Sequence, residues 1–238
     1  RYFMSNRTLT IAAVCLAAVV LLGSAAQAGI VGSKHDFGGS TWSNNEICLP
    51  CHTPHGGSDA TTGGPMWNHE VPANATYAYD TYDATGAVSD GSPGSTTLDK
   101  NSMLCMGCHD GSIALDSFGG VSGTQKIEAG FRVVKDGSLT GNHPIGTAGA
   151  YPTADGLTAS APYMVSPSIW EGANHGMMLK KIDVEGTTKY VVGCTTCHEP
   201  HNRKNQKAML WIKNSGTATT ADGRVVSGSG LCLTCHKK

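Results

Sequence analysis

The sequence predicts a chain that is mostly coil, with short helices, a few short strands and little core made of protein alone. Of its 238 residues, 31 are Gly, only 6% are aromatic and only 15% are charged. This composition supplies few of the large side chains that fill an ordinary core. In addition, eight of the nine cysteines recur in pairs of one spacing, each followed by His. We therefore expect bound groups to fill the interior.

The first residues read as an export signal. Residues 9–22 are almost wholly apolar, Arg7 precedes them, and Ala26-Gln27-Ala28 matches a cleavage site. We predict that residues 1–28 are removed and that the mature chain begins at Gly29. The alternative, a membrane anchor, is disfavoured because the apolar run is short for a span. Cys15 would leave with the signal, and the mature chain offers no other membrane-spanning segment.

The cysteine pairs match the attachment signature of c-type haem, C-x-x-C-H. They are Cys48-Leu49-Pro50-Cys51-His52, Cys105-Met106-Gly107-Cys108-His109, Cys194-Thr195-Thr196-Cys197-His198 and Cys232-Leu233-Thr234-Cys235-His236, here called the first to fourth motifs. Two thiols one turn apart reach the two vinyl groups of one porphyrin edge, and the adjacent imidazole becomes the proximal iron ligand. The sequence therefore predicts a multihaem cytochrome c wrapped around four covalently bound haem c groups.

Two other interpretations of the cysteines are weaker. A disulfide framework is common in exported chains, but it does not explain why His follows every second Cys. Zinc sites also use C-x-x-C pairs, yet they do not require His at that one position. The repeated histidine favours haem.

Six further histidines are candidates for the distal iron position: His35, His55, His69, His143, His175 and His201. Four are needed for bis-His ligation throughout, and we expect His35, His55, His143 and His201 first, His69 next and His175 last. Such haems are six-coordinate, low-spin and of low potential. A methionine such as Met66, Met103 or Met178 would instead raise the potential.

Two of these histidines follow a proximal His by three residues, in Cys51-His52-Thr53-Pro54-His55 and Cys197-His198-Glu199-Pro200-His201. On a helical turn both imidazoles of such a pair lie on one side, and Pro makes the turn rigid. The second imidazole cannot reach the far face of the same haem. We therefore expect it to point at a neighbouring haem and to hold two haems close together.

We interpret residues 29–238 as one tetrahaem domain, with haems 1 and 2 in residues 29–120 and haems 3 and 4 in residues 121–238. A short helix is expected at each motif and another at residues 206–213. Alternation predicts short strands at 131–134 and 189–192, the latter paired with 179–182 in a hairpin. Ser92-Pro93-Gly94 predicts a turn.

The chain resembles the OmcE-like multihaem cytochromes, extracellular tetrahaem proteins that polymerise into nanowire filaments. The resemblance is carried by the motifs together with the segments Gly32-Ser33-Lys34-His35-Asp36, Trp67-Asn68-His69 and Asn142-His143-Pro144. It implies stacked bis-His haems and a distal His borrowed from the next subunit. On that reading His55 is the donor and the haem of His236 is the acceptor. A head-to-tail contact of this kind makes a filament.

We therefore expect an electron-transfer protein and not an enzyme. Its partners would be copies of itself, other electron-transfer proteins and extracellular electron acceptors, and its location extracellular or at the cell surface. A monomeric periplasmic shuttle is the main alternative, and a multihaem reductase, which needs an open iron position, is a weaker one. The formal net charge of −1 offers no basic surface for nucleic acid.

Overall fold

The computed structural model describes residues 29–57, 66–82, 88–150, 179–184, 186–220 and 225–236. His175, Met178 and the predicted signal peptide lie outside these ranges. Within them no helix is both long and apolar enough to cross a bilayer.

Short elements separated by coil make up the described chain, which confirms the predicted fold class. The described ranges contain three antiparallel hairpins, and their longest helix, α3, has ten residues. The helices and strands, in chain order, are η2 Thr41–Ser43, β1 Thr76–Tyr82, β2 Val88–Thr97, α3 Lys100–His109, η3 Ala129–Phe131, η4 Gly146–Gly149, β3 Lys180–Val184, β4 Thr187–Val191, α4 Cys194–Cys197, η7 Lys207–Met209, β5 Thr217–Thr219, β6 Val225–Ser227 and α5 Gly230–Cys235.

The main apolar cluster is small. Tyr79, Leu98, Met106 and Leu139 are its buried members, and they join the β1–β2 hairpin to α3. A cluster of this size buries little apolar surface on its own. This agrees with a chain whose interior is completed by bound groups.

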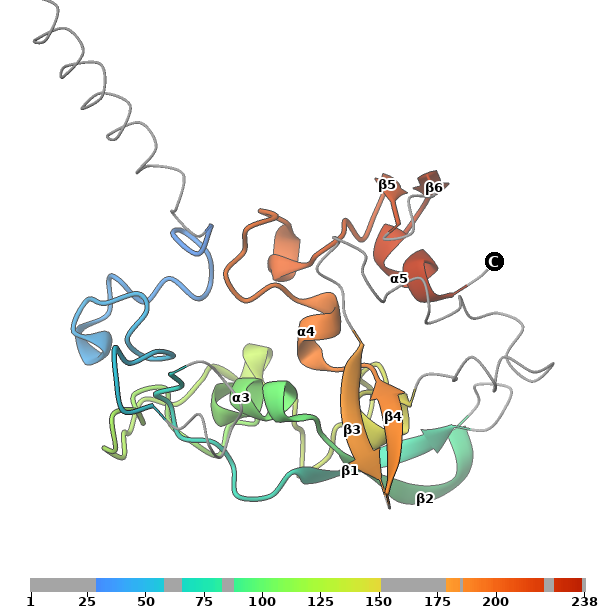
Figure 1. Cartoon of the computed structure of the whole chain (residues 1–238), viewed down its shortest axis with the longest axis horizontal. Coiled ribbons are helices and arrows are strands. Elements are labelled where there is room, and N and C mark those ends of the chain that lie inside the picture. Colours follow the sequence, from blue (N-terminus) through green and yellow to red (C-terminus); the bar gives the residue numbers. More distant parts are fainter. Residues whose placement is uncertain are drawn as a thin grey trace, which may run out of the picture.

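Two of the motif helices, α3 and α4, lie next to each other in the middle of the molecule (Figure 1). Figure 1 shows α4 beside α3, with the N-terminal segment toward one end and α5 toward the other. Asp99 caps α3 by accepting the backbone N–H of Asn101 and Ser102. The Ser102 hydroxyl in turn accepts the N–H of Cys194 at 2.9 Å, so the N-termini of the two helices are tied together.

The hairpin predicted from residues 179–182 and 189–192 is confirmed as β3 and β4, which pair from Lys180 with Val191 to Val184 with Thr187. Helices are also confirmed at the second, third and fourth motifs. At the first, third and fourth motifs, the N–H of the motif histidine donates to the carbonyl of the first Cys, four residues earlier, and closes a turn.

The first motif forms this single turn without becoming a helix, so the helix predicted there is wrong. Asn44 and Asn45 adopt left-handed conformations just before it. After it, the carbonyl of Cys51 accepts the N–H of Asn68 at 3.0 Å, and His52 bridges to Trp67. These contacts direct the backbone away from a helical path on both sides of the motif.

The strand predicted at 131–134 is also wrong, because its backbone groups bond elsewhere. The carbonyl of Phe131 accepts the His109 ring at 2.8 Å. The N–H of Val133 donates to the carbonyl of His109, and the carbonyl of Val133 accepts the Asn142 amide. The segment therefore closes the end of α3 and pairs with no strand.

Two further expectations fail for local reasons. Pro93 and Gly94 lie within β2, opposite Asp80 and Tyr79, and not in a turn. A two-stranded hairpin has only edge strands, and an edge strand accommodates Pro. The helix expected at 206–213 shrinks to η7, because Ala208 and Met209 are left-handed.

Candidate haem-binding site

The eight motif cysteines are all free thiols, so none is committed to a disulfide. Within the described ranges no cluster of three or more His, Cys, Asp or Glu side chains is placed to hold a metal ion. Burial is the main cause that raises the pKa of the Cys51 thiol to about 11 and that of Cys108 to about 12. Before haem attachment these groups are therefore thiols, not thiolates.

Neighbouring motifs bring their sulfurs together in chain order. The Cys105 thiol donates a hydrogen bond to the sulfur of Cys194, which raises the pKa of the first and lowers that of the second. Cys51 is close enough to Cys108, and Cys197 to Cys232, for each pair to interact electrostatically. The four motifs are thus neighbours in chain order: first, second, third, fourth.

Three motif histidines each face a histidine from outside the motifs. The ring centroids of His52 and His201 are 6.1 Å apart, those of His109 and His35 are 6.0 Å apart, and those of His236 and His143 are 6.3 Å apart. Two imidazoles that bind one metal ion from opposite sides, each through a nitrogen at about 2 Å, have centroids about 6.3 Å apart. The three pairs therefore have the spacing that an iron between them requires.

The angle between the rings varies from 20° for His52 and His201 to 66° for His236 and His143. This does not weaken the fit, because each ring can rotate about the axis through the metal. Every pair combines one motif histidine with one other histidine, as proximal and distal ligands of one haem do.

Backbone carbonyls orient several of these rings. The Nδ1 atoms of His109, His198 and His143 lie 2.8, 2.9 and 2.9 Å from the carbonyl oxygens of Phe131, Ala208 and Pro144. A ring that donates through Nδ1 keeps Nε2 as the acceptor, which is the arrangement found in metal-bound imidazoles. The residues present thus fit haem, which supplies a reversible one-electron couple when bound.

A backbone carbonyl also orients the ring of His35. Its Nδ1 is 3.4 Å from the carbonyl oxygen of Pro200. Burial, followed by the neighbouring His109, lowers the pKa of His35 to about 4. Its imidazole is therefore neutral at pH 7, with a lone pair available to a metal. Burial and the proximity of His143 likewise lower the pKa of His236.

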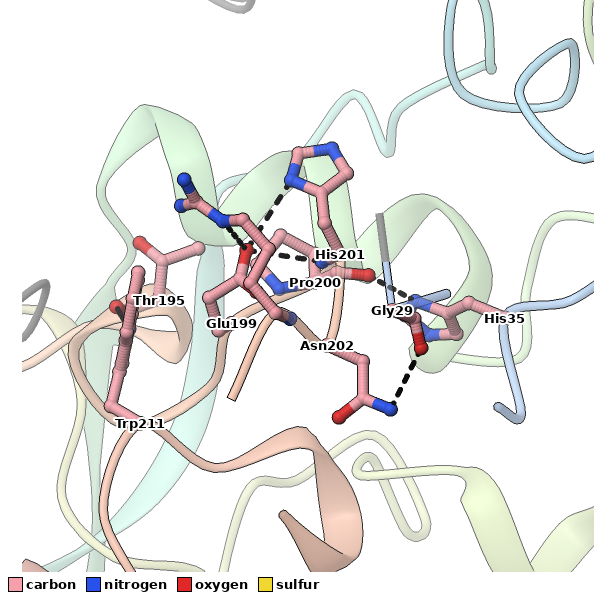
Figure 2. Close-up of polar contacts among 9 residues, drawn as sticks. Gly29, His35, Thr195, Glu199, Pro200, His201, Asn202 and Trp211 are labelled. Atoms are coloured by element: carbon pink, nitrogen blue, oxygen red, sulfur yellow. Dashed lines mark hydrogen bonds and ion pairs between the residues drawn. The ribbon is translucent and has the colours of Figure 1, made fainter. Parts of the chain in front are cut away.

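One short segment, residues 199–203, positions distal candidates for two motifs. Figure 2 shows the Pro200 carbonyl reaching His35, the Asn202 amide reaching the carbonyl of Gly29 (3.0 Å), and Glu199 reaching His201. His201 itself faces the first motif, and His35 faces the second. The segment that follows the third motif therefore organises the first and second.

Glu199 is an organising residue that the sequence pattern did not single out. Its side chain is 1% exposed, and its carboxylate lies 3.3 Å from Nδ1 of His201 and 3.3 Å from Nε of Arg203. Burial alone would raise the pKa of this carboxyl. Backbone N–H groups of Arg203 and His201 and the Arg203 charge outweigh burial and hold the pKa below its usual value. A charged residue between two histidines was the only available signal.

The remaining histidines differ from these pairs. His69 is buried, with Nδ1 2.7 Å from the carbonyl oxygen of Glu70 and Nε2 3.0 Å from that of Ala114. His55 and His198 are exposed, and in the described part of the chain neither has a histidine ring facing it. The third motif therefore lacks a distal partner in the described ranges.

Comparison with protein families gives one match, to the model described as "Doubled CXXCH motif", over residues 190–238. Neither the curated proteins nor the solved structures gave a match. The matched region contains the third and fourth motifs together with α4 and α5. It indicates covalently bound haem c of the multihaem cytochrome kind, and such haems are typical of electron transfer.

Proposed function

We propose that this protein transfers electrons through four bis-His haem c groups attached at the four motifs. The observation that carries the proposal is the set of three histidine pairs at 6.0 to 6.3 Å. A histidine pair at three of the four irons leaves no open position for a substrate there, which favours electron transfer over a reductase. No bond is made or broken, and the protein contributes ligand identity, orientation and burial.

The order of the attachment sites supports a continuous path. Sulfurs of successive motifs are neighbours: Cys51 with Cys108, Cys105 with Cys194, and Cys197 with Cys232. Electrons would pass from the first motif to the fourth without a long gap inside one subunit.

We further propose that subunits join head to tail, with His55 serving the third motif of the preceding subunit. Within the chain, the 194–201 segment supplies His201 to the motif two places earlier. The 48–55 segment has the same C-x-x-C-H-x-P-H pattern. Two places before the first motif is the third motif of the preceding subunit, where exposed His198 lacks a facing histidine in the described ranges.

This assignment replaces the acceptor named from the resemblance. The haem of His236 was expected to borrow His55, but His143 lies against His236. Moving the acceptor to His198 leaves each described motif histidine with one partner. A head-to-tail contact does not close on itself and so builds a filament.

An extracellular location completes the proposal, since a filament made of secreted subunits would carry electrons to acceptors outside the cell. The predicted signal peptide in residues 1–28 supports export. Other electron-transfer proteins would donate electrons to the filament.

The test compares His55→Ala with a control in the same region of the chain, Glu46→Ala, which changes another exposed side chain, using electron microscopy and the proportion of low-spin haem. We expect His55→Ala to abolish filaments and leave one haem in four high-spin, whereas Glu46→Ala should keep the filaments and four low-spin haems. Normal filaments with four low-spin haems in His55→Ala would reject the intersubunit ligand and favour a carrier completed within one chain.

A further inference from the structure

The described non-motif histidines differ in what faces their ring nitrogens. His35 and His143 have Nδ1 close to the neutral carbonyls of Pro200 and Pro144. His201 has Nδ1 3.3 Å from the carboxylate of Glu199. Among the described non-motif histidines, it is the one whose ring lies against a carboxylate.

The Glu199 carboxylate is fixed in place. It is 1% exposed and accepts the backbone N–H groups of His201 and Arg203. Pro200 restricts the backbone between Glu199 and His201. Figure 2 shows Glu199 directed at the His201 ring from the same short segment. The contact is therefore part of the folded arrangement, and not a chance approach of two mobile surface groups.

We propose that Glu199 lowers the reduction potential of the haem held by His52 and His201 below that of the haems held by His109 with His35 and by His236 with His143. A carboxylate beside Nδ1–H makes the imidazole a stronger electron donor. Its negative charge also stabilises the oxidised iron, which carries one more positive charge than the reduced iron. This inference rests on the proposed bis-His haems, and it gives one of them a lower reduction potential than the two others named.

Arg203 opposes this effect. Its Nε lies 3.3 Å from the same carboxylate oxygen that approaches His201. Its side chain is 62% exposed, so water and salt screen its charge, whereas the carboxylate is buried. The buried carboxylate of Glu199 should therefore outweigh the exposed guanidinium of Arg203. Removing the Glu199 charge should raise the reduction potential of the haem, and removing the Arg203 charge should lower it.

The experiment is a spectroelectrochemical titration of the haem-loaded protein. Glu199→Gln keeps an oxygen that can accept the backbone N–H groups but removes the charge. We expect it to favour reduction of one haem by about tenfold, which is an upward shift of about 59 mV for a one-electron couple. Arg203→Gln should shift the same haem downward. The exposed carboxylate of Glu46 provides the control, and Glu46→Gln should leave every potential unchanged.

A double-mutant cycle assigns the affected haem. In a His201→Ala background, Glu199→Gln should produce a smaller shift, because the contact through the imidazole is lost and only the through-space effect of the charge remains. The inference is overturned if folded, low-spin Glu199→Gln keeps all wild-type potentials, or if Arg203→Gln shifts a potential upward. If Glu199→Gln does not fold, Glu199→Asp decides, because it keeps the charge but draws the carboxylate away from His201, and it should raise the same potential by a smaller amount. High-spin haem throughout the wild-type protein would instead overturn the proposed function.

Discussion

The 48–55 and 194–201 segments share the pattern C-x-x-C-H-x-P-H but differ in their surroundings. The second carries α4, is tied to α3 through Ser102, and sends His201 to the first motif. The first forms only a hydrogen-bonded turn and leaves His55 exposed. The same pattern therefore forms a contact between two motifs of one chain at 194–201, here called the inner junction. At 48–55, in our proposal, it forms a contact between subunits.

The residue between the two histidines sharpens the contrast. Glu199 is buried against His201, whereas Thr53 uses its hydroxyl to bond the backbone carbonyl of His55 at 2.8 Å. An inner junction can hold a buried charge because neighbouring backbone groups stabilise it. The exposed 48–55 segment has no buried position of this kind for a charged side chain.

Removing haem should abolish both junctions, which is the largest effect expected. The buried cluster around Tyr79 and Met106 is too small to replace the apolar surface that haem contributes. Far-UV circular dichroism and chemical-denaturant titration of haem-free protein should show a largely unfolded chain. A cooperative transition matching that of the haem-loaded protein would contradict this.

His201→Ala should show how the roles of the two segments differ, because its effect should already be visible within a single subunit. It removes the partner of His52, so one haem should become high-spin in dispersed subunits and in filaments alike. His55→Ala, by comparison, should change the haem spectrum only where subunits would otherwise meet. Electronic absorption and paramagnetic resonance measure both, and equal effects of the two substitutions on dispersed subunits would remove the distinction between them.

Gly193→Ala should loosen the inner junction. A Cβ at this position would overlap the carboxylate oxygen of Asp99 and lie 2.9 Å from the hydroxyl of Ser102, and overpacking of this kind costs about 1–3 kcal/mol. The corresponding residue before the first motif is Ile47. Denaturant unfolding should show the loss, while Gly39→Ala, where a Cβ meets no atom within 4 Å, should change stability little.

Trp211→Phe should have the smallest effect. The indole N–H donates to the carbonyl of Thr195 at 3.0 Å, which joins the chain after η7 to α4. Losing it should cost about 1 kcal/mol of unfolding free energy without changing the haem spectrum. A change in spin state would show that Trp211 also determines the position of the third motif.

The sequence indicates covalently bound haem c through its C-x-x-C-H motifs, whereas it predicted the path of the backbone only in part. Fixed C-x-x-C-H spacing identifies attachment sites because the porphyrin edge requires it, and the β3–β4 hairpin followed from alternation. The strand expected at 131–134 failed because the carbonyl of Phe131 orients His109. Alternation reports side-chain burial and cannot show that a distant imidazole will use a backbone group.

The same limit applies to the distal ligands. Spacing indicated that His201 would face a motif other than its own, but not which one. The pairing of His143 with His236 depends on chain folding over nearly a hundred residues, and no local pattern encodes it. The role of Glu199 could not be predicted, because it depends on the burial of its side chain, which the sequence does not show.

High-resolution electron microscopy of protein secreted by its native cells tests the central claim most directly. The account predicts filaments with a continuous line of haem density, His201 opposite His52 across one haem, and His55 of one subunit opposite His198 of its neighbour. Single particles of one subunit, with every haem ligated from within the same chain, would contradict the filament. Haem density lying away from the three histidine pairs would contradict the account of the site itself.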